Sequence, residues 1–276
     1  MRPVIAYPGT EGSFSHAAAR RTFEGGELVS FPTFREVAQA VVEHRADYGL
    51  LPVENSSAGA VLPTYKLLEA LPLTIAAEVM EPVRHQLLGV PGATLAGIRR
   101  ITSHPQAIAQ CDRFLAGLTG VAIVPSENTA LSAREVAEKG DPTVAAIASR
   151  QAAERFGLRV LAEDIQTSSH NVTRFYVIAC GREPLGVPDK ATVIFTVNNE
   201  VGALVRVLSI FAEHGLNMSR IESRPLPESA FYYFFSVDLE GDMDAAHLHR
   251  AMQAARPYTQ QLRLLGTYPK AARPEA

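Results

Sequence analysis

The hydrophobic and polar positions of the first 180 residues predict short strands separated by helices. Residues 4–7 and 48–53 are apolar runs that end in polar turns, as buried strands commonly do. Ser13 is placed to cap a helix, and residues 34–45 carry apolar side chains at helical spacing. We therefore expect an α/β architecture in this part of the chain.

A second set of strands and helices follows from Leu73 onward. Strands are predicted at 87–90, 100–102 and 143–147, and helices at 105–115 and 149–156. The apolar run at 172–179 is a last predicted strand, which we expect to return to the first set. Two such lobes would leave a cleft between them, and small ligands commonly bind in clefts.

The remaining third of the chain predicts a separate domain. Residues 181–190 are rich in Gly, Pro and charge and predict a linker. A βαββαβ pattern follows, with strands at 191–197, 218–225, 231–239 and 261–268, and with helices that begin after Asn198-Asn199 and at 245. We expect a four-stranded antiparallel sheet with both helices on one face. The open face would suit a partner, so we expect dimerisation.

Composition and charge restrict the class of protein. The 276 residues suggest about two domains, and 47% hydrophobic with 20% charged residues is ordinary for a soluble chain. A net charge of −3 provides no positive field for nucleic acid or an anionic membrane. Cys111 and Cys180 lack metal-motif spacing and predict reduced thiols. Because neither a signal peptide nor a membrane-spanning run is predicted, we expect a soluble cytoplasmic protein.

Three common chemistries lack their motifs. His247 and His249 would point in different directions on a helix, and no CxxC, HExxH or EF-hand pattern occurs, so no metal site is expected. The turn at 9–12 lacks the glycine patterns of nucleotide-binding loops. It is either a tight strand-to-helix turn or a carboxylate site formed with the Ser13 hydroxyl. Residues 168–170 (SSH) lack a GxSxG elbow, which argues against a serine hydrolase.

Polar side chains that can bind a small anion gather at the predicted strand ends. They are Ser13, Glu54, Asn55, Ser56, Ser103, Gln106, Asn171, Thr173 and Arg174. Glu54 can equally cap a helix or bridge the lobes, and Arg174 can be a buried ion-pair partner or a substrate clamp. Hydroxyls and amides with one or two cations suit a dianion, and a reaction that needs positioning and hydrogen bonding to a leaving group.

Motifs spread along the chain resemble, in the same order, the monofunctional prephenate dehydratase family with a C-terminal ACT domain. They are GTEGSFS (9–15), DYGLLPVENS (47–56), SHPQA (103–107), AIAS (146–149), NVTRF (171–175), GAL (202–204), LNM (216–218) and IESRP (221–225). Thr10 and Ser13 stand where the family often has Pro and Thr, so Ser13 retains the hydroxyl. Ordered motifs over nearly the whole chain are more specific than any single one.

The resemblance implies conversion of prephenate to phenylpyruvate, water and CO2, a step of L-phenylalanine biosynthesis. It implies a two-lobed, periplasmic-binding-protein-like catalytic domain at 1–180, with lobe boundaries near 72 and 162. A linker at 181–190 and an ACT domain with a ferredoxin-like βαββαβ fold at 191–269 would follow. No metal or cofactor is implied. No chorismate mutase region precedes Met1, so a single activity is expected.

The resemblance also assigns roles to residues. Thr173 would be the essential hydroxyl that hydrogen-bonds or protonates the departing 4-hydroxyl group. Because threonine is a weak acid, orientation and hydrogen bonding are easier to defend than strong acid catalysis. Arg174 would assist a carboxylate or hold its loop. The substrate pocket would be shaped by Ser13, Glu54, Asn55, Ser56, Ser103, Gln106, Ser149, Asn171 and Phe175.

In the tail, the resemblance implies feedback control by L-phenylalanine bound between two ACT domains of a homodimer or homotetramer. Gly202 would let this ligand approach the backbone at a helix N-terminus. The implied binding residues are Gly202, Ala203, Leu204, Asn217, Met218, Glu222, Ser223, Arg224 and Pro225. Residues 222–225 can alternatively be an edge strand that stops at proline.

Two other functions stay open at this point. Arogenate dehydratase runs the same elimination on the transaminated substrate, and the choice depends on whether the pocket prefers a keto or an amino group. A non-catalytic amino-acid sensor would bind ligands in both domains, and its response need not depend on the Thr173 hydroxyl.

Overall fold

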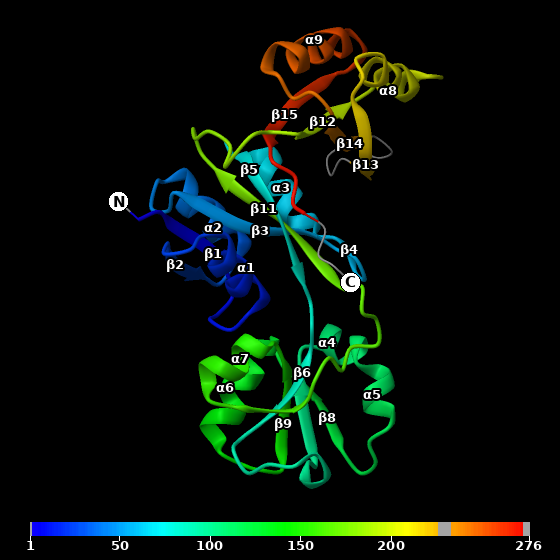
Figure 1. Ribbon diagram of the computed structural model, residues 1–276. Helices are drawn as coiled ribbons and strands as arrows, with labels where there is room; N and C mark the ends of the chain where they lie inside the picture. The colour runs from blue at the N-terminus through cyan, green and yellow to red at the C-terminus, as the bar shows by residue number, and fades with distance from the viewer. Residues whose placement is uncertain (1, 226–232, 273–276) are drawn as a thin grey trace. The chain divides into compact units, whose positions relative to one another are not determined.

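The computed structural model describes residues 2–225 and 233–272, which belong to two compact units (Figure 1). The first unit comprises the described residues of 1–69, 79–175 and 272–276, and the second those of 70–78 and 176–271. Strands β5 (Thr74–Pro82) and β11 (Val172–Ala179) therefore each run from one unit into the other.

The first lobe is built on a sheet with the strand order β2-β1-β3-β11-β5, and β4 pairs with β3. Its other strands are β1 (Val4–Pro8), β2 (Glu27–Phe31), β3 (Tyr48–Asn55) and β4 (Gly59–Ala60). Its helices are α1 (Phe14–Thr22), α2 (Phe34–Val42) and α3 (Leu62–Ala70). Ser13 starts α1 by accepting the His16 N–H at 3.2 Å, as its position predicted.

The second lobe is a sheet with the order β10-β6-β9-β7-β8 and flanking helices. The strands are β6 (Gln86–Gly89), β7 (Arg100–Ser103), β8 (Ala122–Pro125), β9 (Val144–Ala148) and β10 (Arg159–Ala162). The helices are α4 (Pro105–Gln110), α5 (Asp112–Ala116), α6 (Thr129–Lys139), α7 (Arg150–Phe156) and a 3-10 turn, Leu95–Gly97.

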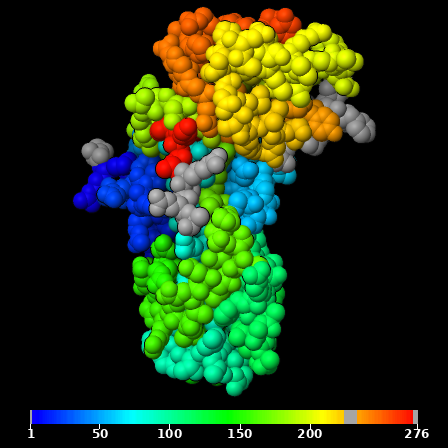
Figure 2. Space-filling view, turned by 45° about the vertical axis from the view of Figure 1, so that its right-hand side comes forward, coloured from blue at the N-terminus to red at the C-terminus, as the bar shows by residue number. Residues whose placement is uncertain are grey.

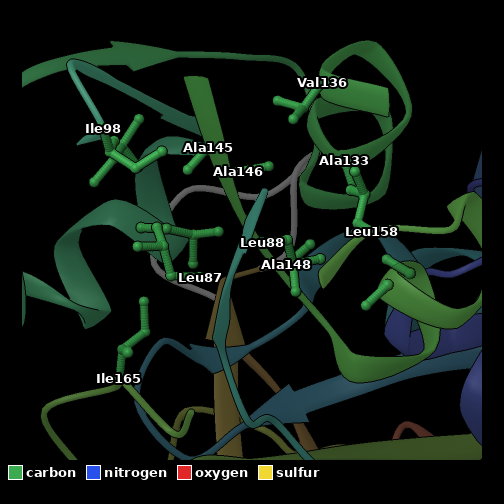
Figure 3. Close-up of a cluster of buried hydrophobic side chains, with 14 of the residues drawn as sticks. Leu87, Leu88, Ile98, Ala133, Val136, Ala145, Ala146, Ala148, Leu158 and Ile165 are labelled. Carbon is green, nitrogen blue, oxygen red and sulfur yellow. The ribbon is translucent and has the colours of Figure 1, made fainter. Parts of the chain in front are cut away.

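The core of the second lobe combines large side chains with small ones. Leu87 and Leu88 of β6 lie near Ala145 and Ala146 of β9, with Val136 of α6 on the same cluster (Figure 3). The small alanines let the helices approach the sheet closely, and burial of the leucines removes apolar surface from water. This core holds helices α6 and α7 against the sheet.

The second unit carries the sheet β13-β14-β12-β15, in which every neighbouring pair is antiparallel. The strands are β12 (Lys190–Thr196), β13 (Asn217–Pro225), β14 (Tyr233–Glu240) and β15 (Gln261–Tyr268). Helices α8 (Ala203–Glu213) and α9 (Ala245–Ala255) pack on one face, followed by a 3-10 turn, Arg256–Tyr258. Atoms of α8 and β13, in yellow, cover much of the near face of this unit in Figure 2. The expected βαββαβ order is confirmed, and residues 231–232 of one expected strand lie outside the described residues.

The structure differs from the predicted elements at three places. The expected helix at 105–115 is divided into α4 and α5 at Cys111. Helix α8 begins after Gly202, whose φ of 79° suits glycine, and not directly after the two expected asparagine caps. Strand β5 belongs to the first sheet, so the chain passes to the second lobe between Pro82 and Gln86, later than the expected position near 72. Elements β2, β4, α3, β5, β8, α6 and β10 were not anticipated.

Gly12 offers a test of how closely the lobes are packed. Its φ is 83°, and a Cβ there would lie 3.1 Å from the Cα of Ala152 in α7. Gly25 also has a positive φ, 74°, but no atom lies within 4 Å of its Cβ position. We expect both Gly→Ala variants to lose about 1 kcal/mol of unfolding free energy through backbone strain. Gly12→Ala should lose more because of the added contact, as urea unfolding would measure; equal losses would contradict tight packing here.

Candidate active site

A cavity of about 200 Å³ lies between the two lobes of the first unit. It is lined by Phe14, Asn55, Val83, His85, His104, Gln106, Ala107, Gln110, Asn128, Thr129 and Thr173. These residues come from α1, β3, α4, the start of α6, β11 and the segment that joins the two sheets. None of these lining residues is Lys, Arg, Asp or Glu. A ligand in this cavity therefore meets amides, hydroxyls, imidazoles and apolar groups.

Asn55, at the end of β3, joins three segments of the chain. Its Oδ1 accepts the backbone N–H groups of Ser57 and Ala58, both at 3.0 Å, which fixes the orientation of the carboxamide. Its Nδ2 then donates to Asn171 Oδ1 at 2.8 Å and to Thr173 Oγ1 at 3.0 Å. Because Thr173 accepts from Asn55, its own hydroxyl proton is left to donate into the cavity.

His85 lies against Phe14 and Gln110 in the wall of the cavity. Its Nε2 is 2.8 Å from Gln110 Oε1, and its backbone N–H donates to Gln166 Oε1 at 2.8 Å. The Phe14 ring meets the imidazole edge-on at a centroid distance of 5.6 Å. Burial lowers the pKa of His85, and the hydrogen bond to Gln110 opposes this more weakly. The imidazole is therefore neutral at neutral pH.

The N-terminus of helix α6 lies at the cavity. Asn128 Oδ1 accepts the Leu131 N–H at 2.7 Å and so caps α6, and Thr129 is the first residue of this helix. The N-terminal end of a helix carries a partial positive charge and free N–H groups, which favour anions. This end of α6 is therefore a part of the cavity wall that can attract a carboxylate.

Three of the expected site residues line the cavity: Asn55, Gln106 and Thr173. Asn171 does not line the cavity; it accepts a hydrogen bond from Asn55, is buried, and has no hydrogen-bond partner for its amide nitrogen among the described residues. The fold thus brings Asn55, Asn171 and Thr173 into one hydrogen-bonded group.

Arg174 and Glu54 form an ion pair, with Nη1 and Oε2 3.8 Å apart. The Arg174 side chain is buried, while that of Glu54 is partly exposed. Arg174 was expected to be either a buried ion-pair partner or a substrate clamp, and the structure contains the ion pair. Neither Arg174 nor Glu54 lines the cavity. The pair joins β11 to the end of β3, next to Asn55.

The structure does not place Ser13, Ser56, Ser103, Ser149 or Phe175 in the cavity lining. Ser13 caps α1 and Phe175 is buried in the core. Ser56 Oγ donates to the backbone oxygen of residue 170 at 2.8 Å, and Ser103 Oγ to that of residue 147 at 2.7 Å. Ser149 Oγ donates to the backbone oxygen of residue 12 at 2.7 Å, which ties α7 to the turn before α1.

Sequence reasoning missed several lining residues: Phe14, Val83, His85, His104, Ala107, Gln110, Asn128 and Thr129. Gln110 could have been found, because it follows Gln106 by one helical turn and shares its face. Asn128 could have been found as a helix N-cap. His85 carries no local signal, since its place depends on how the chain passes between the two sheets.

A second cavity, of about 160 Å³, lies in the second unit. It is lined by Val197, Asn198, Asn199, Glu200, Ala203, Leu204, Tyr233 and Phe235. Ala203 and Leu204 were expected to bind phenylalanine, and both line this cavity. Gly202 directly precedes them as the N-cap residue of α8. The N-terminus of α8 therefore forms part of the wall of this cavity, as the N-terminus of α6 does in the first cavity.

The other expected tail residues lie along β13. Ser223 is paired with Phe235 of the cavity, whereas Asn217 and Met218 pair at the far end of β14. Glu222 forms a close ion pair with Arg220. The backbones of residues 224 and 225 continue the pairing, and their side chains lie outside the description.

Within the described residues, no group of three or more His, Cys, Asp or Glu side chains is arranged to hold a metal ion. No helix in the described part of the chain is long and apolar enough to cross a bilayer. Cys111 and Cys180 are free thiols, and burial raises the pKa of Cys111 to about 12, which makes this thiol unreactive.

The lowered pKa of His85 predicts a pH effect on stability. The unfolded chain binds the proton more readily, so stability from a neutral His85 is present above about pH 6.5 and declines as the pH falls below it. His85→Gln should flatten the loss of unfolding free energy between pH 7.5 and pH 5.5, measured by urea unfolding. An unchanged slope would contradict this assignment of the proton.

Comparison with known proteins gives consistent matches. Residues 5–183 match the family model for prephenate dehydratase, and residues 191–256 match that for the ACT domain. A bifunctional chorismate mutase/prephenate dehydratase of Aquifex aeolicus is 38% identical over 97% of this chain and 74% of that protein. Arogenate dehydratase/prephenate dehydratase 1, chloroplastic, of Arabidopsis thaliana is 37% identical over 96% and 71%. The crystal structure of prephenate dehydratase from Arthrobacter aurescens in complex with L-Phe has a TM-score of 0.85 at 32% identity, over 96% of this chain and 89% of that one.

Proposed function

Because the chain belongs to the prephenate dehydratase family, we propose that it converts prephenate to phenylpyruvate, water and CO2 in L-phenylalanine biosynthesis. The fold is the expected two-lobed periplasmic-binding-protein-like domain with a C-terminal ACT domain. The observation that carries the proposal is the Thr173 hydroxyl, oriented by Asn55 in a cavity without charged lining residues.

The reaction breaks the bond between ring carbon C1 and its carboxylate, which leaves as CO2. The electron pair of that bond moves through the ring and expels the 4-hydroxyl group, which takes up one proton and leaves as water. The ring thereby becomes aromatic, so the enzyme has mainly to orient the substrate and stabilise the departing oxygen. Thr173 would donate its hydrogen bond to that oxygen, and the Asn55 amide would hold the Thr173 oxygen in place.

We propose prephenate over arogenate as the substrate, and the lining of the cavity supports this choice. Arogenate carries an ammonium group, which would call for a carboxylate partner, and none of the lining residues is Asp or Glu. The keto acid of prephenate can instead be met by amide N–H groups and by the start of α6. Gln106 offers such a donor from the cavity lining, while the Arg174–Glu54 pair would hold the β3 and β11 ends together.

We also propose feedback control by L-phenylalanine bound at the cavity of the second unit. Its carboxylate would lie at the α8 N-terminus beside Gly202, and its ring against Leu204, Tyr233 and Phe235. Val201, 99% exposed, and the exposed Val205 and Ile221 would be covered by a second ACT domain. A homodimer or homotetramer would supply that cover, with the ligand bound between the copies. Ser223, which pairs with Phe235, would contribute from β13.

The proposed organisation is a catalytic domain at 1–180, a linker at 181–190 and an ACT domain at 191–269. We place the protein in the cytoplasm, which the two free thiols favour.

Thr173→Val tests the hydroxyl. We expect kcat to fall by at least ~100-fold, because the departing oxygen loses its donor while the cavity keeps its shape. Thr173→Ser, which retains the hydroxyl, is the matched control and should keep most of the activity. Phenylalanine binding, followed by calorimetry, should be unchanged in both. Turnover retained by the valine variant would remove Thr173 from the mechanism.

The direct test of function is phenylpyruvate formation from prephenate by the purified protein, with and without millimolar phenylalanine, beside arogenate as competing substrate. We expect activity on prephenate that phenylalanine suppresses. A preference for arogenate would reassign the substrate. Binding of both ligands without turnover of either substrate would favour the non-catalytic sensor.

A further inference from the structure

Buried polar side chains occupy the face of the four-stranded sheet that points away from α8 and α9. This junction cluster consists of Glu78, Tyr176, Lys190, Thr192, Asp238 and Tyr268, each at most 6% exposed. Glu78 and Tyr176 belong to β5 and β11, the two strands that continue into the first unit. The other four residues belong to the sheet of the second unit. Buried polar groups are costly unless they are paired, so this arrangement is specific.

The Asp238 carboxylate is the centre of the cluster. Its Oδ1 accepts the Thr192 hydroxyl at 2.9 Å and the Tyr176 hydroxyl at 3.3 Å. The Tyr268 hydroxyl is 2.5 Å from Thr192 Oγ1, and it is the donor because the Thr192 proton is directed to Asp238. Tyr176 thus joins β11 to β14 of the sheet, whereas Tyr268 joins two strands of the same sheet.

A second connection runs through Lys190. Its Nζ donates to Glu78 Oε2 at 2.8 Å and lies 3.8 Å from Asp238 Oδ2. Lys190 therefore joins β5 to β12 and connects with the carboxylate that holds Tyr176. The attraction within such a pair only roughly offsets the cost of burying its charges, and removal of one partner leaves the other charge buried and unpaired.

Both strands lead directly to the candidate active site. Thr173 and Tyr176 lie three positions apart on β11. Val83, which follows β5, lines the active-site cavity and donates its N–H to the backbone oxygen of Asn171 at 2.8 Å. A shift of either strand would alter the orientation of the Thr173 hydroxyl.

The other end of the connection is the cavity of the second unit. Tyr233 and Phe235 line that cavity from β14, and Asp238 projects from the opposite face of the same strand. A ligand that displaces β14 to fit against Phe235 therefore also displaces the acceptor of the Tyr176 hydroxyl.

We propose that the hydrogen bond from Tyr176 to Asp238, supported by the Lys190–Glu78 pair, transmits occupancy of the second-unit cavity to β11 and Thr173. The inference rests on the proposed function and names the contact through which phenylalanine regulates it. Tyr176 accordingly couples the second-unit cavity to β11 and takes no part in the reaction itself. Phenylalanine inhibits because it binds more tightly to the arrangement of the junction cluster in which β11 is misplaced for catalysis.

Tyr176→Phe in the full-length protein removes the hydroxyl and keeps the ring. Tyr268→Phe is the matched control, since it removes a buried hydroxyl from the same cluster without breaking the connection to β11. We expect the phenylalanine concentration for half-inhibition to rise at least ~10-fold in Tyr176→Phe and to stay near the wild-type value in Tyr268→Phe. Calorimetry should still detect phenylalanine binding to both, and kcat without phenylalanine should stay close to wild type. Glu78→Gln, which weakens the second connection, is a further variant should Tyr176→Phe not fold.

Inhibition of Tyr176→Phe equal to that of wild type would overturn the inference and leave the proposed function intact. Equal desensitisation of both tyrosine variants would also overturn it, because the cluster would then act only by stabilising the sheet. A wild-type protein that turns over prephenate but ignores phenylalanine would overturn the proposed regulation and this inference together.

Discussion

The orientation of one carboxamide, that of Asn55, underlies the candidate active site. Two backbone N–H groups fix its oxygen, so its nitrogen must donate toward β11. This bond aligns Asn171 and Thr173 with the end of β3, although more than a hundred residues separate them in sequence. Without it, the Thr173 hydroxyl could rotate or accept from the ligand, and the site would lose its defined donor.

Charge is distributed differently in the two functional regions. The active-site cavity is lined by helix ends, amides, hydroxyls, imidazoles and apolar groups, and Arg174 and Glu54, which do not line it, are paired with each other. A dianion can therefore bind without competing against lining carboxylates, while CO2 leaves from a site of low charge. The junction cluster instead buries Lys190 with two carboxylates, and such groups enforce one geometry between strands. The two regions thus differ in where their charged side chains lie: outside the lining of the active-site cavity, and at the centre of the junction cluster.

Sequence reasoning was most successful where local patterns specify structure. The strands at 172–179 and 261–268 have the predicted bounds and helix α9 begins at the predicted residue 245, because apolar periodicity and turn residues define them. Asn55, Gln106 and Thr173 were found as polar residues at strand and helix ends. Serine hydroxyls were harder to interpret, since a serine such as Ser103 can satisfy a buried carbonyl as readily as a ligand.

The sequence by itself determined the βαββαβ tail, the alternating first part and the hydroxyl-and-amide chemistry, because these follow from periodicity and from side-chain types. Only the tertiary structure decided that β5 and β11 share the first sheet, that His85 and Asn128 face Thr173, and that Tyr176 reaches Asp238. These relations depend on pairing between distant strands and on which face of each strand is covered. Such long-range contacts are selected by the packing of the whole chain and leave no periodic trace in any one segment.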